Sequence, residues 1–254
     1  LTVEQNYNTI KNWMDIDEYI NYQISEIFYD NVFWPEQNMR MWREKKDGAK
    51  WRWILHDLDF GFGMQNQRSI GYANNSLKLA TSNKINNEFT PPLWSTLIFR
   101  KLLSNDEVKI KFIQRFSSYL NSIFHQDTVL SKINELQNVI APEMSRHINR
   151  WRNGEFYYGN PIQNFSEWLN NVNVMKEFAQ KRQGFQRQHI IDYFNLSGTA
   201  IVNLKFNNEF SGSVQINDVE SIGHNSSNTF FKDIPIELKA VPNVGYKFVK
   251  WIGV

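Results

Sequence analysis

The chain has 254 residues, of which 41% are hydrophobic and 15% aromatic, so it is long enough for one sizeable packed domain and a smaller one. Its 28 basic and 26 acidic residues give a net charge of +2, and no basic tract is interleaved with aromatic residues, so we expect no nucleic-acid partner. The chain has no cysteine, which excludes disulfides and thiolate metal sites, and no apolar run approaches the length of about eighteen residues that a membrane span needs.

Residues 15–29 predict an amphipathic helix. Asp15 and Glu18 have the spacing of a capping box at its start. Apolar residues then recur on one face, namely Ile16, Ile20, Ile24, Ile27 and Phe28. We expect this helix to pack beneath the hairpin that follows it.

Residues 38–44 and 50–58 predict two strands joined by a tight turn at Asp47-Gly48. Pairing around this turn would set Asn38 and Asp57 roughly opposite each other. The sequence therefore predicts that these two side chains are neighbours.

The second strand ends on two carboxylates, Asp57 and Asp59, and then on Gly61 and Gly63, a composition typical of a strand that enters an exposed, flexible loop. If the extended conformation continues, both carboxylates lie on the face of Trp51, Trp53 and Leu55. Such carboxylates repel each other and lose hydration unless a cation or hydrogen bonds compensate them. Magnesium suits this arrangement, because it prefers oxygen ligands. A solvated turn in which an aspartate caps a backbone group is the alternative.

Residues 64–92 are rich in Asn, Gln and Ser and predict a long surface loop, in which Arg68, Lys78 and Lys84 are candidate phosphate contacts or simply solvated charges. A helical block follows. Its expected helices span 93–103, a second capped by Ser104 with Glu107, 127–139, a fourth from Pro142 to Trp151, and one or two within 165–193.

After residue 195 the pattern changes from helical periodicity to alternation, with short strands expected at 201–206, 213–216, 234–241 and 246–251. We therefore predict an α+β protein with two parts. Residues 1–195 form a mainly helical lobe with a β-hairpin at its site, and residues 196–254 form a small all-β domain.

The segments NVFWPEQNMRMWR (31–43), KWRW (50–53) and DLDFG (57–61) resemble the spore-coat CotH kinase family in order and spacing. Members of this family have an atypical protein-kinase-like fold. The resemblance implies that residues 1–195 correspond to the carboxy-terminal lobe of a kinase, and that the cofactors are ATP and Mg²⁺.

The resemblance also implies roles for individual residues. Asn38 matches the magnesium-binding asparagine after the catalytic turn, and Asp57 matches the metal-binding aspartate of the kinase Asp-Phe-Gly motif, so both are expected to bind the Mg²⁺–ATP cofactor. Asp59 is a second acidic residue beside it, and the string Asp59-Phe60-Gly61 permits the other register. Asp57 and Asp59 are thus the candidate catalytic residues, and Asn38, Asp57 and Asp59 the candidate metal ligands.

The chain departs from the family pattern at Phe33, where the family turn carries an aspartate before Trp-Pro. The residue expected to orient or deprotonate the acceptor hydroxyl is therefore missing. Asp30 and Glu36 lie three residues to either side and are candidate replacements. Loss of this group slows phosphoryl transfer without abolishing nucleotide binding, because transfer depends mostly on positioning and charge stabilisation.

The sequence before residue 15 is too short for the strand-rich lobe that carries the phosphate-binding lysine of a kinase. The ATP clamp is therefore either upstream in a longer protein or absent, and a start that lacks Met indicates that the chain is a fragment. We therefore expect weak nucleotide binding and no measurable phosphoryl transfer by residues 1–254 alone.

The string IELKAVPNVGYKFVKW (236–251) is similar to the internalin B-repeat type of β-module. This similarity implies a secreted or bacterial cell-surface protein. Two functions follow from the two resemblances together. One is a kinase that phosphorylates Ser or Thr hydroxyls of a surface or secreted protein, and the other is a catalytically degenerate binding or scaffold protein.

Overall fold

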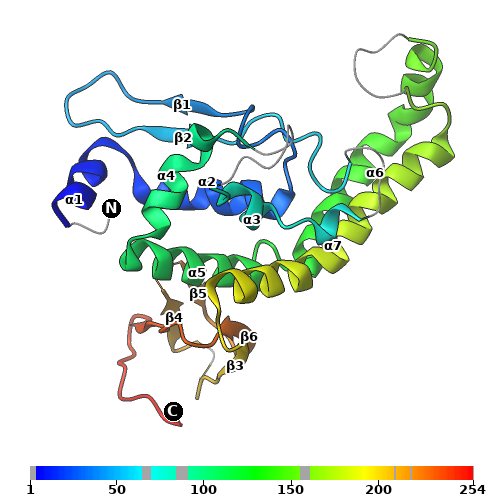
Figure 1. The fold of residues 1–254 in the computed structure, drawn as a ribbon. Coiled ribbons are helices and arrows are strands. Elements are labelled where there is room, and N and C mark those ends of the chain that lie inside the picture. The colour runs from blue at the N-terminus through cyan, green and yellow to red at the C-terminus, as the bar shows by residue number, and fades with distance from the viewer. Residues whose placement is uncertain are drawn as a thin grey trace.

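The computed structural model describes residues 4–64, 70–83, 91–154, 161–208, 210–217 and 219–253. Its helices and strands, in chain order, are α1 (Glu4–Trp13), α2 (Ile16–Tyr29), β1 (Arg40–Trp42), β2 (Arg52–Ile54), η2 (Gly71–Ala73), α3 (Ser76–Ala80), α4 (Leu93–Leu103), α5 (Asp106–Asn121), α6 (Gln126–Trp151), α7 (Phe165–Phe194), β3 (Thr199–Leu204), β4 (Gly212–Ile216), β5 (Glu220–Ile222), β6 (Ser226–Phe231) and β7 (Leu238–Pro242). The α+β class predicted from the sequence is confirmed, with a helical part followed by small antiparallel sheets (Figure 1). None of the helices in the described ranges is long and apolar enough to cross a membrane.

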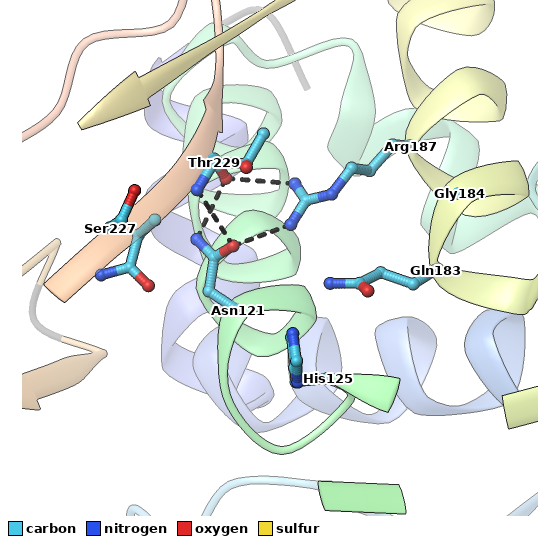
Figure 2. A pocket seen from close by; sticks show the side chains of 8 residues that line it. Asn121, His125, Gln183, Gly184, Arg187, Ser227 and Thr229 are labelled. Atoms are coloured by element: carbon cyan, nitrogen blue, oxygen red, sulfur yellow. Dashed lines mark hydrogen bonds between the residues drawn. The ribbon is translucent and has the colours of Figure 1, made fainter. Parts of the chain in front are cut away.

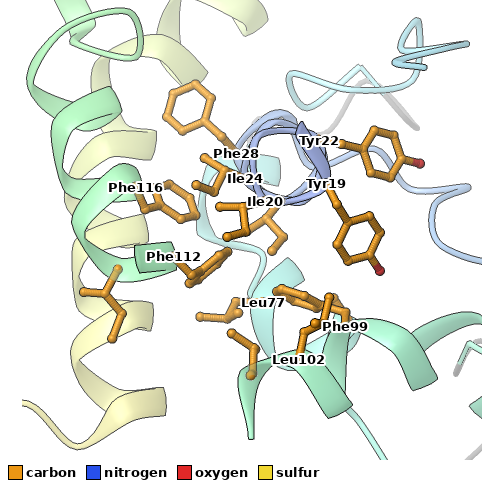
Figure 3. Packing of buried hydrophobic residues seen from close by; sticks show 14 of the residues in the cluster. Tyr19, Ile20, Tyr22, Ile24, Phe28, Leu77, Phe99, Leu102, Phe112 and Phe116 are labelled. Carbon is orange, nitrogen blue, oxygen red and sulfur yellow. The ribbon is translucent and has the colours of Figure 1, made fainter. Parts of the chain in front are cut away.

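Helix α2 lies at the centre of the main hydrophobic core, as its apolar face predicts. Ile20, Ile24 and Phe28 point toward α5, and Phe112 and Phe116 of α5 fill the facing space (Figure 3). All of these side chains are buried. Burial of large apolar side chains stabilises the fold by about 1.5–3 kcal/mol each, so α2 is the most strongly fixed element near the hairpin.

The hairpin of β1 and β2 is attached to the start of α2. The side chain of Asp15 caps α2 by accepting from the Glu18 backbone N–H, as predicted. The carboxylate of Glu18 accepts instead from the Trp53 backbone N–H at 2.9 Å, and the Trp53 ring packs edge-on against Tyr19. The Asp15 carboxylate also forms an ion pair with the Arg52 guanidinium. The hairpin is thus held on the amino-terminal end of α2.

The helical block differs from the prediction in two places. Helix α5 is capped by Asn105, which accepts from the Val108 N–H, and not by Ser104. Residues 126–151 form one helix that contains Pro142, where two helices were expected. Met144 and Ile148 on that helix pack against Trp168 and Val172 of α7, and this packing keeps the helix continuous past the proline. Residues 165–194 are a single helix, and α6 and α7 lie side by side in Figure 1.

The expected long loop is partly helical. Within the described part of 64–92, η2 and α3 form, and Leu77 and Ala80 are buried in the main core. The Asn75 side chain caps α3 by accepting from the Lys78 N–H. Lys78 is exposed to solvent, and Arg68 and Lys84 lie outside the described residues.

The part of the chain after α7, which we call the β-module, consists of a β3–β6 pair and a sheet of order β5-β4-β7. It has its own small core around Ile216 and Phe230. The expected strand at 246–251 is absent from the described structure, where this segment has no regular pairing and β7 ends at Pro242. Strands β5 and β6 were not predicted, since β5 has only three residues and β6 begins with Ser and Asn residues that are typical of loops. In Figure 1 the module lies on the opposite side of α5 and α7 from the hairpin.

Arg182 of α7 ties the end of α2 to the segment before α3. Its guanidinium is 0% exposed and donates five hydrogen bonds. Four acceptors are carbonyls at 2.6–3.0 Å, namely the Ile27 and Phe28 oxygens of α2 and the Tyr72 and Asn74 oxygens. The fifth is the Ser76 hydroxyl. All five N–H groups of the side chain are thereby used.

We predict that Arg182→Met lowers the free energy of unfolding by at least about 3 kcal/mol, because it leaves several buried carbonyls without donors. Urea denaturation measures this change. Arg146→Met is the matched control, since Arg146 is exposed on α6 in an ion pair with Glu143 and its loss should change stability by less than about 1 kcal/mol. Equal stability of the two variants would contradict the role given to Arg182.

Candidate functional site

The turn between α2 and β1 is compact and places Asn38. Trp34 is buried, its backbone N–H donates to the Asn31 carbonyl, and the Trp34-Pro35 peptide is cis. The Gln37 N–H then donates to the Phe33 carbonyl at 2.7 Å. Asn38 ends the turn in the left-handed region with φ 57°, a conformation that asparagine tolerates better than most residues. The chain therefore enters β1 with the position of Asn38 already fixed.

Asn38 and Asp57 are neighbours, as the hairpin predicted. The strands pair with Arg40 opposite Ile54, and beyond the pairing the Asn38 Nδ2 donates to the Asp57 carbonyl at 3.1 Å. This bond uses the amide nitrogen of Asn38, so the amide oxygen is the atom of that side chain that can bind a metal ion. The structure thus brings the predicted amide and the chain segment of the predicted carboxylate together.

The placement of Asp57 and Asp59 by strand alternation is wrong. Strand β2 ends at Ile54, and Asp57 has φ 59°, so the extended conformation does not continue to the carboxylates. Both side chains are exposed to solvent and do not end an apolar face. They are hydrated at the mouth of the hairpin, where a cation can approach them from solution.

The loop after Asp59 is not exposed and flexible, as its glycines suggested. Gly61 and Gly63 are buried, and the Phe62 N–H donates to the Tyr29 carbonyl at the end of α2. A Cβ on Gly61 would lie 3.0 Å from the Tyr29 oxygen, so a side chain there would crowd the backbone of α2. The glycine permits this close approach, which holds the segment 57–63 against α2.

Phe33 fills the position of the expected catalytic aspartate with an apolar contact. Its ring packs edge-on against Phe60, with the ring centroids 5.2 Å apart. Asp30 is not a replacement, because it is buried and accepts hydrogen bonds from Asn74 at 2.8 Å and Ser76 at 2.5 Å. Glu36 is exposed and is the remaining acidic residue of the turn.

A buried carboxyl group lies beneath the turn. Glu26 of α2 is 0% exposed, and its Oε2 accepts from the Asn31 Nδ2 at 2.9 Å. Burial raises the pKa of Glu26 to about 7, against the opposing effect of the Asn31 and Tyr22 side chains. The Trp34 indole nitrogen and the Tyr22 hydroxyl are also buried here. The turn therefore rests on a polar layer whose charge changes near neutral pH.

The oxygens of Asn38, Asp57 and Asp59 suit Mg²⁺, which usually takes one or two carboxylates and completes its shell with water and phosphate oxygens. In the part of the chain that the structure describes, no three His, Cys, Asp or Glu side chains gather into a metal cage. The residues thus fit an ion shared with a ligand better than an ion enclosed by protein.

Sequence reasoning missed Arg182, Ser76 and Glu26, which support the site from below. Arg182 is one charge in a long helix with other basic residues, and nothing in its local pattern distinguishes it. Glu26 carries no local signal either, since it lies well outside the helix face that Ile20, Ile24 and Ile27 define, where a carboxylate is normally exposed to solvent.

We predict that stability falls as pH rises from about 4.5 to about 7 through Glu26. The folded protein keeps this proton to higher pH than the unfolded chain, whose carboxyl titrates at 4.5, so the contribution is complete below pH 4.5 and is lost as pH passes 7. The difference corresponds to about 3 kcal/mol. Urea unfolding at pH 5 and pH 8 measures it.

Glu26→Gln should remove this pH dependence while it keeps an acceptor for Asn31. Glu143→Gln, an exposed carboxylate on α6, should retain the wild-type dependence. An unchanged pH slope in Glu26→Gln would show that another group is responsible.

Comparison with known proteins identifies the family of the chain. The family model described as CotH kinase protein matches residues 2–185, which include the turn, the hairpin, the loop at 57–63 and Arg182. No curated protein and no solved structure matched the chain. The match ends before β3, so it does not extend to the β-module. Because it covers well over half of the sequence, the chain is a member of the CotH kinase family.

Proposed function

We propose that this chain carries the metal-binding lobe of an ATP- and Mg²⁺-dependent protein kinase that transfers phosphoryl groups to Ser or Thr hydroxyls of a surface or secreted protein. The observation that carries this proposal is the contact of Asn38 with Asp57 at 3.1 Å across the hairpin of a CotH-family chain. It places the Asn38 amide beside the backbone of the aspartate whose carboxylate corresponds to the one a kinase uses for magnesium.

Each side chain has a role in this proposal. Asn38 presents its amide oxygen to the ion, oriented by the bond from its nitrogen to the Asp57 carbonyl. Asp57 supplies the charged oxygen, and Asp59 is a second carboxylate two residues on. When bound, Mg²⁺ neutralises charge on the β- and γ-phosphates of ATP. The protein contributes position and charge compensation, which account for most of the catalysis of phosphoryl transfer.

The acceptor side of the site lacks a general base at residue 33. Glu36 is exposed in the same turn, whereas the Asp30 carboxylate is bound to Asn74 and Ser76. Proton removal by a positioned group contributes about 10²–10⁴-fold to rate. We therefore propose a slow enzyme whose metal half-site is intact.

The nucleotide side needs a positive group on the phosphates. Within the described residues the strands form only two- and three-stranded sheets, and none of these is a nucleotide-covering lobe. We therefore propose that residues 1–254 alone bind ATP weakly and do not transfer phosphate measurably.

The second candidate function is a catalytically degenerate scaffold, and the Phe33–Phe60 contact favours it. An aromatic pair at the catalytic position stabilises the fold by roughly 0.5–1.5 kcal/mol. It also leaves no carboxylate at residue 33 to accept the proton of an acceptor hydroxyl. In that case the hairpin and the β-module bind a partner protein. The surface or secreted location of either form is supported by the resemblance of residues 236–251 to an internalin-type repeat.

We predict that Asp57→Asn weakens Mn²⁺ binding in the presence of ATP by at least about tenfold, because a charged oxygen ligand is lost. Asparagine accepts the left-handed backbone of residue 57, so the fold is kept. Equilibrium dialysis of the Mn²⁺–ATP complex against the protein measures the affinity, since ATP itself binds Mn²⁺.

Asp47→Asn is the matched control, since Asp47 is exposed in the turn of the same hairpin. It should bind Mn²⁺ as the wild type does. Equal loss of affinity in both variants, or in neither, would refute the assignment of Asp57.

We predict that, if residue 33 alone makes the site degenerate, Phe33→Asp in a longer protein that also carries a nucleotide-covering lobe raises phosphoryl transfer from ATP to a Ser/Thr-rich acceptor by about 10²-fold or more. Phe33→Leu, which also removes the contact with Phe60 but adds no carboxylate, should not. Transfer of radiolabelled γ-phosphate measures the rates. No gain in Phe33→Asp would rule out residue 33 as the sole cause of a defect.

A further inference from the structure

A polar pocket of about 390 Å³ lies where the helical part meets the β-module. Residues from α5, from the turn before α6, from α7 and from β6 line it, namely Asn121, His125, Gln183, Gly184, Arg187, Ser227, Asn228 and Thr229. None of these is acidic. The module and the hairpin lie on opposite sides of α5 and α7, so the pocket is separate from Asn38 and Asp57 (Figure 1).

Arg187 is the one cation of the pocket lining. Its Nη1 donates to the Thr229 carbonyl at 3.1 Å and its Nη2 to the Asn121 Oδ1 at 2.7 Å (Figure 2). These two bonds use two of five N–H groups. Burial lowers the pKa of Arg187 to about 10, with no contribution from a carboxylate among the described residues. A half-buried cation with neutral partners is unfavourable, and an oxyanion would compensate it.

The other polar groups present donors. The His125 Nδ1 accepts from the Asp127 backbone N–H, so the proton of the neutral ring is on Nε2, at the opposite edge. The Asp127 carboxylate lies 3.6 Å from Nδ1, is exposed and is not part of the lining. Gln183 uses its Nε2 once, toward the Leu120 carbonyl, and retains a second N–H. Figure 2 shows Gln183 extending from α7 on the same side as Arg187, and His125 below Asn121.

Gly184 borders the pocket. It lies inside α7, where glycine is the least favourable residue apart from proline. No atom lies within 4 Å of the Cβ that another residue would add, and its φ is not positive, so neither crowding nor backbone geometry requires glycine here. A residue that breaks helix preference without a packing reason is expected at functional positions.

We propose that this pocket binds a phosphate group, with Arg187 as the cationic anchor and the His125 Nε2–H and Gln183 amide as further donors. Arg187 and Gln183 lie one turn apart on α7 and His125 lies before α6, so donors from two elements border the space, which suits an anion with several acceptor oxygens. The phosphate is either the free anion or an ester on a side chain of a partner. The site belongs to the junction of the two parts and does not depend on the kinase proposal.

The test is a titration of the full chain with inorganic phosphate at constant ionic strength. Binding is monitored through the melting temperature and through the NMR signals of side-chain amides. In the wild type we expect a saturable rise in melting temperature and shifts of the Gln183 and Asn121 amide signals. A response to phosphate that is no larger than the response to chloride at equal ionic strength would overturn the proposal.

Gly184→Asp is the decisive variant. It puts a carboxylate three residues before Arg187 on the same helix, within reach of the guanidinium. We expect it to weaken phosphate binding at least tenfold and to melt no lower than the wild type without phosphate. Gly184→Ala, which adds a methyl group into the same open space, should keep phosphate binding within about threefold. Equal phosphate binding by Gly184→Asp and Gly184→Ala would overturn the proposal.

Two further ligands identify the source and the geometry of the anion. O-phosphoserine that binds more tightly than phosphate supports an ester on a partner, and phosphate that binds equally or more tightly supports the free anion. Acetate that binds as tightly as phosphate would overturn the assignment to a phosphate group.

Discussion

The carbonyl end of α2 is the constraint on which the site depends. Four carbonyls at a helix end have no partner within the helix, and burial makes an unpaired carbonyl costly. Here the Glu26 oxygen accepts from the backbone of Asp30, the Ile27 and Phe28 oxygens from Arg182, and the Tyr29 oxygen from Phe62. A cation at this end also complements the helix dipole. The same bonds fix where the turn to Asn38 departs and where the loop after Asp59 docks.

Much of this arrangement could be predicted from the sequence, because the signals are local. The helix at 16–29 follows from its cap and its apolar period, and the helix at 93–103 was predicted at its observed limits. The hairpin follows from the Asp-Gly turn between two aromatic segments. Since a hairpin fixes its own register, the proximity of Asn38 and Asp57 followed as well.

The rest depends on contacts between distant segments, which no local pattern reveals. Arg182 donates hydrogen bonds to carbonyls more than a hundred residues away in the sequence. Helix α6 continues through Pro142 because α7 packs beside it, and α3 forms in a polar segment because Leu77 enters the core. Residues 246–251 alternate as a strand does, yet no described strand pairs with them, and an isolated strand is not stable. The exposed carboxylates likewise reflect the early end of β2.

We propose above all that Asn38 and Asp57 together hold one divalent ion. Crystals of the protein grown with Mn²⁺ and a non-hydrolysable ATP analogue test it through the anomalous signal of the metal. We expect a peak at about 2 Å from both the Asn38 Oδ1 and an Asp57 carboxylate oxygen. A metal bound away from the hairpin, or an Asn38 amide that turns its oxygen from the ion, would contradict it.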